Sequence, residues 1–573
     1  MYQYDEYDQQ IIDDRVSQYR DQMARHLAGN LSADDLRPLR LQNGLYIQRH
    51  GPMHRIAIPY GALAAYQLRK LAEISLRYDR GYGHFTTRQN IQFNWPKFED
   101  TPDILGELAT VQMHAVQTSG NCVRNITSDH FAGVAPDELT DPRPYCELLR
   151  QWSTFHPEFA FLPRKFKIAV NAAREDRAVI RAHDVGLEVL RNAAGEWGVM
   201  VLVGGGLGRT PVLGKVLREF LPRRDLLSYL DAVLRVYNRY GRRDNLYKAR
   251  IKILVNALGI EEFARQVEAE WAGLKDGPLS LTNEEFDRVA AHFAPPEYAT
   301  LSAVDADYEA QLVHDKAFAQ WAKRCVHGHK IPGYASLTLS LKKAGVPPGD
   351  ITAEQMRSVA DLADAYSFGE VRISHEQNVI LADVKQSELF AVWQAARRQG
   401  LATANIGLLT DMICCPGGDL CSLANARSIT IAEAVNERFD NLDYVHDIGD
   451  ISLNISGCMN SCGHHHVANI GILGVDKNGE EWYQITLGGQ QGKAATIGQV
   501  IGPSFSAHEV PDVISTLINT YVEQRQPEER FIDTLHRLGV ALFKEKVYAG
   551  RSRTRPSTPA ATPAASDEQT TPA

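Results

Sequence analysis

The chain has 573 residues, which at about 150 residues per domain corresponds to three or four domains and leaves room to bury a large cofactor. Its composition, with 44% hydrophobic and 23% charged residues, is that of a soluble globular protein and excludes wholesale disorder and fibrous architecture. The formal net charge of −9 argues against general nucleic-acid affinity, because phosphate binding needs a dominant basic face. Eight cysteines are too few for a disulfide scaffold at this length.

The N-terminal sequence gives no sign of a targeting segment. The first residues, MYQYDEYDQQIIDDR, are acidic and lack the basic start and apolar run of a signal peptide. No stretch resembles a membrane span of about 20 apolar residues, so we expect a cytoplasmic protein that binds neither membrane nor nucleic acid. Residues 6–35 mix dense charge with scattered apolar side chains, which predicts one or two solvated helices. The tail from Arg551, rich in Pro, Thr, Ala and Ser, is predicted to be disordered.

The chain contains a diverged internal duplication, which a single constant shift along the sequence makes visible. In both copies an amphipathic helix (residues 67–78 and 355–366) precedes a short strand (84–95 and 370–381) and a second helical stretch. The second copy has Glu376 where the first has Arg88. The identical pairs are Ala65/Ala353, Gln67/Gln355, Arg69/Arg357, Ala72/Ala360, Tyr78/Tyr366, Gly81/Gly369, Gln89/Gln377 and Asn90/Asn378.

A weaker echo, at a slightly smaller shift, pairs VGGGLGRT, from Val203, with LGGQQGK, from Leu487. Each segment follows a predicted strand, FKIAVNAA in the first half and HHVANIGILGV in the second. The two echoes together indicate a two-fold repeat of paired α/β modules with a junction near residues 300–328. Because ligands often bind between such halves, we expect the site at their interface. The first half has LPRKFK where the second has cysteines.

Four cysteines form two close pairs, Cys415 with Cys421 and Cys458 with Cys462. Such thiolates can close a tetrahedral zinc site or hold a [4Fe–4S] cluster. The gaps of five and three residues, in loops rich in Gly and Asn, favour the bulkier cluster. Cys414 is adjacent, but the proline after Cys415 fixes a turn there, so we prefer Cys415 as the ligand.

This cysteine pattern resembles that of the sulfite and nitrite reductase hemoprotein family, whose members bind siroheme bridged to a [4Fe–4S] cluster. The likeness covers roughly residues 30–545 and is greatest to the assimilatory sulfite reductase hemoproteins. It implies an α+β fold with paired ferredoxin-like half-domains and two mixed α/β repeat domains that hold siroheme between them. In the family the last cysteine thiolate also bridges to the siroheme iron, a role that falls to Cys462.

The resemblance divides the chain into six segments. It implies an N-terminal helical extension (1–40), a first ferredoxin-like half-domain (41–117), a first siroheme-binding repeat domain (118–310), a second ferredoxin-like half-domain (325–404), a second repeat domain with the cluster (405–548) and a disordered tail (549–573).

Three further motifs match the family: TTRQ, NCVRN and LPRKFK. The resemblance implies that Arg88, Arg124, Lys165 and Lys167 surround the anion on the distal face of the siroheme. Arginine stays protonated and holds oxyanions through a forked set of donors, whereas a lysine near other cations has a lowered pKa and can deliver protons. We therefore expect the arginines to bind and polarise and the lysines to bind and protonate.

Siroheme carries eight carboxylates, so its pocket needs cations or N–H donors. We expect Arg164, Arg209, Asn460 and Lys493 to contact the cofactors, with help from the basic stretch 235–252. The run His464–His466 is expected to be buried structure rather than a metal site.

The expected activity is the six-electron reduction of sulfite to sulfide. Lys167 favours sulfite, since sulfite enzymes typically carry Lys at the end of LPRKFK and nitrite enzymes commonly Asn. The alternatives are an assimilatory nitrite reductase and, from another class, a non-enzymatic zinc or redox-sensing protein. No flavin or NADPH module is visible, so electrons are expected from ferredoxin or from a separate NADPH-dependent flavoprotein subunit.

Overall fold

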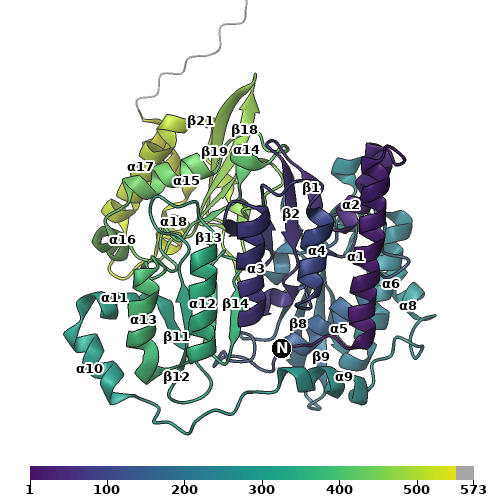
Figure 1. Ribbon diagram of the computed structural model, residues 1–573. Helices are drawn as coiled ribbons and strands as arrows, with labels where there is room; N and C mark the ends of the chain where they lie inside the picture. The colour runs from purple at the N-terminus through teal and green to yellow at the C-terminus, as the bar shows by residue number, and fades with distance from the viewer. Residues whose placement is uncertain (550–573) are drawn as a thin grey trace, which may run out of the picture.

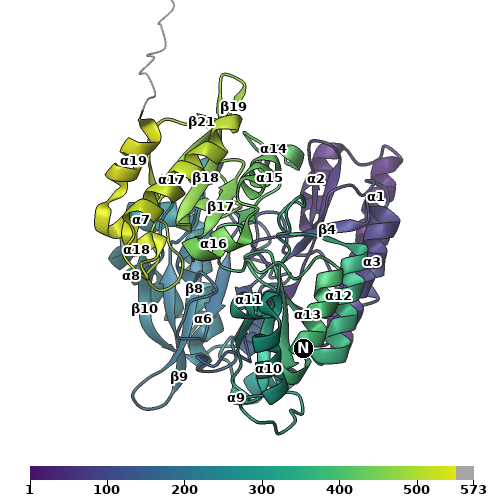
Figure 2. The ribbon, with the colours of Figure 1, turned by 90° about the vertical axis from the view of Figure 1, so that its left-hand side faces the viewer.

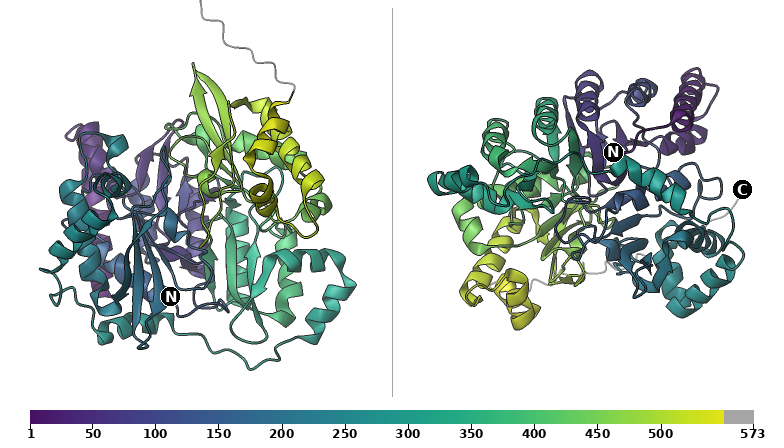
Figure 3. Two further views of the ribbon diagram at one scale, coloured as in Figure 1. Left: turned by 180° about the vertical axis from the view of Figure 1, so that it is seen from behind. Right: turned by 90° about the horizontal axis from the view of Figure 1, so that it is seen from below.

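The computed structural model describes residues 1–549, and the predicted tail lies outside them apart from Ala549. The described chain folds around four β-sheets, two in each half of the duplication. Figure 1 shows helices side by side across one face of the molecule, and Figure 3 shows the sheets of the repeat domains from behind. Those helices are α1 (Glu6–Leu27), α3 (Ala65–Tyr78), α4 (Thr101–Ala109), α12 (Ala353–Tyr366) and α13 (Leu389–Arg398).

The two ferredoxin-like sheets exchange one strand with each other. In the first sheet the fifth strand, β13, comes from the second copy, and in the second sheet the fifth strand, β3, comes from the first copy. The first sheet runs β1 (Leu45–Ile47), β2 (Pro52–Ile56), β5 (Ile91–Phe93), β4 (Tyr82–Phe85) and β13 (Asp350–Thr352). The second runs β11 (Val326–Gly328), β12 (Tyr334–Leu339), β15 (Val379–Lys385), β14 (Glu370–Ile373) and β3 (Ala62–Ala64).

A single hydrophobic core joins these two half-domains. Helices α3 and α12 pack against each other, and buried residues of both, including Leu71 and Val359, belong to one cluster. At the N-terminus of α12, Thr352 and Gln355 form a capping box, in which each side chain binds the other's backbone N–H. The predicted helices at 67–78 and 355–366 are confirmed with slightly earlier starts.

The single strand predicted after each of these helices is wrong: each is a hairpin. Strands β4 and β5 are joined by a turn over residues 86–90, and β14 and β15 by a turn over 374–378. The turns require left-handed backbone at Gln89 (φ 57°) and Gln377 (φ 65°), which the sequence motif does not reveal. These turns carry Arg88 and Glu376.

The two repeat domains each contain a mixed sheet, with three parallel strands followed by antiparallel ones. Most residues of their central strands are buried, as expected for strands covered on both faces. The first sheet consists of β6 (Thr127–Ser128), β7 (Ile168–Asn171), β8 (Val185–Arg191), β9 (Trp197–Val203) and β10 (Lys215–Pro222). The second consists of β16 (Ile413–Cys414), β17 (Leu453–Ser456), β18 (Ile470–Lys477), β19 (Glu480–Leu487), β20 (Gln499–Val500) and β21 (Phe505–Ser506).

Helices cover the outer faces of the repeat sheets, as Figure 2 shows for the second half. The first half has α5 (Arg143–Ser153), α6 (Leu226–Tyr240), α7 (Ile251–Leu258), α8 (Ile260–Trp271) and α9 (Asn283–Ala290). The second has α14 (Gly417–Leu420), α15 (Ile429–Arg438), α16 (Leu442–Ile448), α17 (Val510–Gln524), α18 (Phe531–Leu538) and α19 (Val540–Tyr548).

The remaining helices lie at the N-terminus and between the halves. Helix α1 is capped by Asp5 and is followed by α2 (Ala33–Gln42), in agreement with the predicted N-terminal helices. Helices α10 (Ala306–His314) and α11 (Lys316–Cys325) lead into the second half. Within residues 1–549 no helix is long and apolar enough to cross a membrane.

Strand pairing fixes how the repeat domains correspond. Thr127 pairs with Ala169 in the first half as Ile413 pairs with Asn454 in the second, so the two sheets align at a slightly smaller shift than the half-domains. The bridges Gly206–Val212 and Gln490–Thr496 confirm the weaker echo between the glycine-rich loops. LPRKFK therefore precedes β7, whereas the cysteines follow β16 and β17, so the expectation that LPRKFK replaces the cysteines is wrong.

Candidate functional site

The predicted site residues converge from both halves at the ends of the repeat-domain strands. Arg88 lies in the β4–β5 turn, Arg124 precedes β6, and Lys165 and Lys167 precede β7. The cysteines lie in the loops that follow β16 and β17. Thr87, the neighbour of Arg88, brings the two sets together, because its hydroxyl donates to the carbonyl oxygen of Cys462 over 2.9 Å.

Arg88 is held by backbone and hydroxyl oxygens of the strands beside it. Its Nη1 donates to Thr127 Oγ1 over 2.9 Å, and its Nη2 donates to the carbonyl of Asn125. Its Nε–H is buried and has no partner among the described residues. Burial and the neighbouring Arg124 lower the pKa of Arg88 to about 9, which leaves the guanidinium charged near neutral pH.

Arg124 is oriented by the loop that precedes it. Its Nη1 donates to the carbonyl of Thr118 over 2.7 Å, and its Nε and Nη2 both donate to the carbonyl of Gly120. Its Nη2 also lies 3.4 Å from the hydroxyl of Tyr46. Burial alone would raise the pKa of Tyr46, but Arg124, Arg55 and Lys165 outweigh it and lower this pKa to about 8.

Lys165 and Lys167 lie partly buried among cations. Burial and Arg124 lower the pKa of Lys165 to about 8. Burial, Lys165 and Arg88 hold the pKa of Lys167 well below its usual range. Asp184 accepts the backbone N–H of Lys167 over 2.9 Å and is itself paired with Arg250 at 2.7 Å. In residues 1–549 neither lysine ammonium has a hydrogen-bond partner, so both can receive an anion.

The cysteine loops depend on glycine for their close packing. A Cβ on Gly417 would clash with Ser428 Oγ, and one on Gly457 would lie 2.6 Å from the carbonyl oxygen of Ala426. The backbone N–H of Gly457 in turn donates to Cys415 Sγ over 3.2 Å. Cys414, by contrast, is buried and its thiol faces the carbonyl of Cys415. This arrangement supports Cys415 over Cys414 as the ligand.

Burial raises the pKa values of Cys415, Cys421 and Cys458, and neighbouring thiols, including that of Cys462, lie close enough to raise them further. Burial and the other thiols raise the pKa of Cys415 to about 12 and that of Cys458 to about 11, so their thiolates need a cationic metal group to be stable. Sulfur atoms in a tetrahedral zinc site lie about 3.8 Å apart, given a Zn–S distance of about 2.3 Å. Among the described residues, no three cysteine sulfurs lie within 4.8 Å of one another, so the set fits a cluster better than one zinc ion.

The four other predicted cofactor contacts fall in different surroundings. Arg164 is partly buried, and burial lowers its pKa. Asn460 is exposed, yet its backbone and side chain both hydrogen-bond the Cys458 thiol and lower that pKa. Arg209 is exposed in the first glycine-rich loop. Lys493 is also exposed and pairs with Glu188 at 2.6 Å, so it is already neutralised within the protein.

The basic stretch 235–252 divides between surface and site. Arg235 and Arg239 form ion pairs with carboxylates on neighbouring elements. Lys252 instead donates to the carbonyls of Gly206 and Leu207, both at 3.1 Å. It therefore holds the first glycine-rich loop in place.

Sequence reasoning missed several residues of the site. Burial lowers the pKa of Arg55. Tyr46, Cys462 and Cys421 lie close enough to Arg55 to offset part of this shift. Thr87 lies inside the TTRQ motif that was used only for its arginine. Arg250 lies within the basic stretch but could not be distinguished there from its exposed neighbours.

Comparison with known proteins identifies the family. The description "Nitrite and sulphite reductase 4Fe-4S domain" matches residues 119–274 and 409–553. The description "Nitrite/Sulfite reductase ferredoxin-like half domain" matches residues 46–111 and 343–399. The chain belongs to the nitrite and sulfite reductase family. This confirms the predicted α+β fold with paired half-domains and repeat domains.

Similar proteins include reductases of both anions. A sulfite reductase [ferredoxin] of Mycolicibacterium paratuberculosis is 27% identical over 84% of this chain and 81% of its own. A ferredoxin–nitrite reductase of Synechococcus elongatus is 31% identical over 81% of this chain and 85% of its own. The solved structure of the Mycobacterium tuberculosis NirA protein has the same fold, with a TM-score of 0.74, 24% identity and coverage of 91% and 92%.

Membership of the family establishes the cofactors, siroheme and a [4Fe–4S] cluster. The residues present fit both groups. The four thiols suit the cluster, because no three of their sulfurs lie within 4.8 Å of one another among the described residues. An anionic macrocycle and an anionic substrate are suited by the unpaired ammonium groups of Lys165 and Lys167 and by the guanidinium groups of Arg88 and Arg124. When bound, siroheme and the cluster supply an open metal coordination position and stored electrons.

Proposed function

We propose that this protein reduces sulfite to sulfide, with Cys415, Cys421, Cys458 and Cys462 as cluster ligands and Cys462 as the thiolate shared with the siroheme iron. Six electrons and seven protons convert sulfite to hydrosulfide and three waters. Such a reaction needs proton donors beside the bound anion as well as an electron supply. The observation that carries the proposal is the pair of lysine ammonium groups without protein partners beside two anchored arginines.

Each of the four cationic residues has a distinct task in this proposal. Arg88 and Arg124 are fixed by backbone oxygens, so their remaining N–H groups can orient and polarise the oxyanion. Lys165 and Lys167 have lowered pKa values, which makes them better proton donors near neutral pH than ordinary lysines. Arg250 neutralises Asp184, so the carboxylate beside Lys167 does not repel the substrate.

Reduction of nitrite is the second candidate, because the 31% identical Synechococcus elongatus protein is a ferredoxin–nitrite reductase. Lys167 is the residue that favours sulfite, and the variants Lys167→Asn and Lys167→Met test it. We expect sulfite turnover to fall by roughly 100-fold in both, as for loss of a general acid, with siroheme absorption and iron content unchanged. Nitrite turnover should fall less in Lys167→Asn than in Lys167→Met. Unchanged sulfite turnover would remove Lys167 from the reaction.

We propose ferredoxin as the electron donor, since the relatives named above are ferredoxin-dependent. The purified holoenzyme is to be assayed with reduced ferredoxin and, separately, with an NADPH-dependent flavoprotein reductase, on both anions. Turnover with the flavoprotein and none with ferredoxin would overturn this assignment.

A further inference from the structure

The duplication gives the protein a second set of loops that corresponds to the cluster and anion site. The register of the repeat-domain strands places Asp129 at the position of Cys415 and Arg177 at that of Cys462. Backbone conformation supports this correspondence, because Val179 and His464, which the same register aligns, are both left-handed and both precede a 3-10 turn. In the hairpin turns, His375 corresponds to Thr87 and Glu376 to Arg88.

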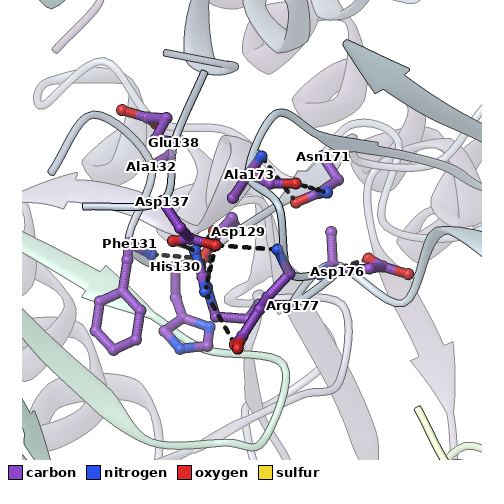
Figure 4. A network of polar contacts seen from close by, with 12 residues as sticks. Asp129, His130, Phe131, Ala132, Asp137, Glu138, Asn171, Ala173, Asp176 and Arg177 are labelled. Atoms are coloured by element: carbon purple, nitrogen blue, oxygen red, sulfur yellow. Dashed lines mark hydrogen bonds and ion pairs between the residues drawn. The ribbon is translucent and has the colours of Figure 1, made fainter. Parts of the chain in front are cut away.

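At this second position an ion-pair network replaces the thiols. Arg177 lies 2.8 Å from carboxylate oxygens of both Asp129 and Asp137, as Figure 4 shows. The arginine charge is therefore offset by two carboxylates. No cysteine lies at these corresponding positions, so a second [4Fe–4S] cluster is excluded there.

Beside this network three metal-binding side chains converge from both halves. One ligand atom from each of His130, His375 and Glu376 lies within 4.8 Å of the others. His130 Nδ1 lies 3.8 Å from Glu376 Oε2, and His375 Nε2 lies 3.2 Å from Glu376 Oε1. The two histidines are 8% and 6% exposed. His130 Nδ1 is buried and has no hydrogen-bond partner in the described chain. Figure 4 shows the His130 ring beside Arg177.

An unpartnered imidazole nitrogen that faces a partly buried carboxylate costs free energy unless a ligand occupies the space between them. Gln491 places one more oxygen beside this group, since its Oε1 accepts a hydrogen bond from His375 Nε2 over 2.7 Å. Arg372 anchors the His130 loop from the other side by donating to its backbone carbonyls, including that of Ala132. The three side chains are thus held near one another by elements of both halves.

We propose that His130, His375 and Glu376 bind a divalent transition-metal ion. Two imidazoles and one carboxylate form a typical ligand set for Zn²⁺ or Fe²⁺, with the Gln491 oxygen or water completing the shell. The charge at this position is reversed between the two copies. Arg88 binds an anion in one site, whereas Glu376 at the corresponding position binds a cation. Because His130 belongs to one half and the other two ligands to the second, the ion joins the halves as a structural metal.

Calorimetric titration of chelator-treated holoenzyme with Zn²⁺ tests this proposal. We expect one tight site, weakened more than about tenfold in Glu376→Gln and in His130→Phe, and unchanged in the control His314→Phe, which removes an exposed histidine at the end of α10. Zinc X-ray absorption of the wild-type complex should show nitrogen and oxygen neighbours at about 2.0 Å and no sulfur.

Three results would overturn the proposal. One is the absence of tight Zn²⁺ binding to intact holoenzyme, and another is a sulfur shell, which would place the zinc at the cluster cysteines. The third is unchanged affinity in both ligand variants while siroheme and cluster absorption show that they are folded. Because the readout is metal affinity and coordination, it can fail while the proposed reductase activity stands.

Discussion

Gln377 is expected to stabilise both the junction of the two halves and the cluster loop. It is 1% exposed, and its Nε2 donates to the carbonyls of Phe85 at 2.8 Å and Cys414 at 3.0 Å. Its Oε1 accepts the backbone N–H of Cys414 over 2.9 Å. Gln377→Met keeps the side-chain length but removes these three bonds, together with the contact of Nε2 with His84 Nε2 at 3.0 Å, and leaves buried backbone groups unpaired. At about 1 to 3 kcal/mol for each of the three unpaired backbone groups, unfolding free energy should fall by about 3 to 9 kcal/mol.

The duplication provides a matched control for this variant. Gln89 makes the corresponding bonds, with Nε2 3.0 Å from the carbonyls of Ser128 and Ile373 and Oε1 3.1 Å from the Ser128 backbone nitrogen. Gln89→Met should therefore cost similar stability in urea unfolding. Only Gln377→Met should lose cluster iron and labile sulfide, because only it holds the strand that ends at Cys414. Equal cluster loss in both variants, or no loss of stability in either, would refute this reasoning.

Two further outcomes follow from the site. Cys415→Ser should lose the cluster, measured as iron and labile sulfide, whereas Cys414→Ser should keep it; the reverse result would exchange the two ligands. Anion affinity should weaken as pH rises through about 8, because burial and Arg124 lower the pKa of Lys165 to that value and only its charged form attracts an oxyanion. Lys165→Arg should flatten that dependence in a spectroscopic titration with sulfite, and a profile as steep as the wild type would contradict it. Tyr46→Phe removes a second group at the site with a pKa of about 8 and should reduce the slope less.

The parts of the fold that the sequence predicted are those where the shift between the two copies stays constant. The shift that places Ala65 on Ala353 holds through α3 and α12, and it even pairs β3 with β13, the exchanged strands. The two cysteine pairs could be recognised in the sequence for a related reason, since their spacing lies within two short loops. Hydrophobic periodicity and local spacing therefore sufficed wherever the relevant contacts are close in sequence.

What the sequence could not predict depends on contacts between distant segments. The hairpin turns need left-handed Gln89 and Gln377, and each side chain is anchored to a carbonyl of the other half, Ile373 or Phe85. The shift between the copies becomes slightly smaller in the repeat domains, which hid the correspondence of the cysteines with Asp129 and Arg177. Small insertions of this kind are invisible until strand register is known.

The exchange of anchoring glutamines allows the two hairpin turns to carry different residues at their tips. Each hairpin turn is fixed at the junction by the opposite half, so its tip residue can change without loss of the turn. Arg88 at one tip joins Arg124 and the two lysines in a cationic cluster, although the whole chain has a net charge of −9. Glu376 at the other tip meets two histidines and takes the opposite charge preference. The fold thus keeps two equivalent positions with one backbone, and in both proposals the side chains at the tips decide which ion each position binds.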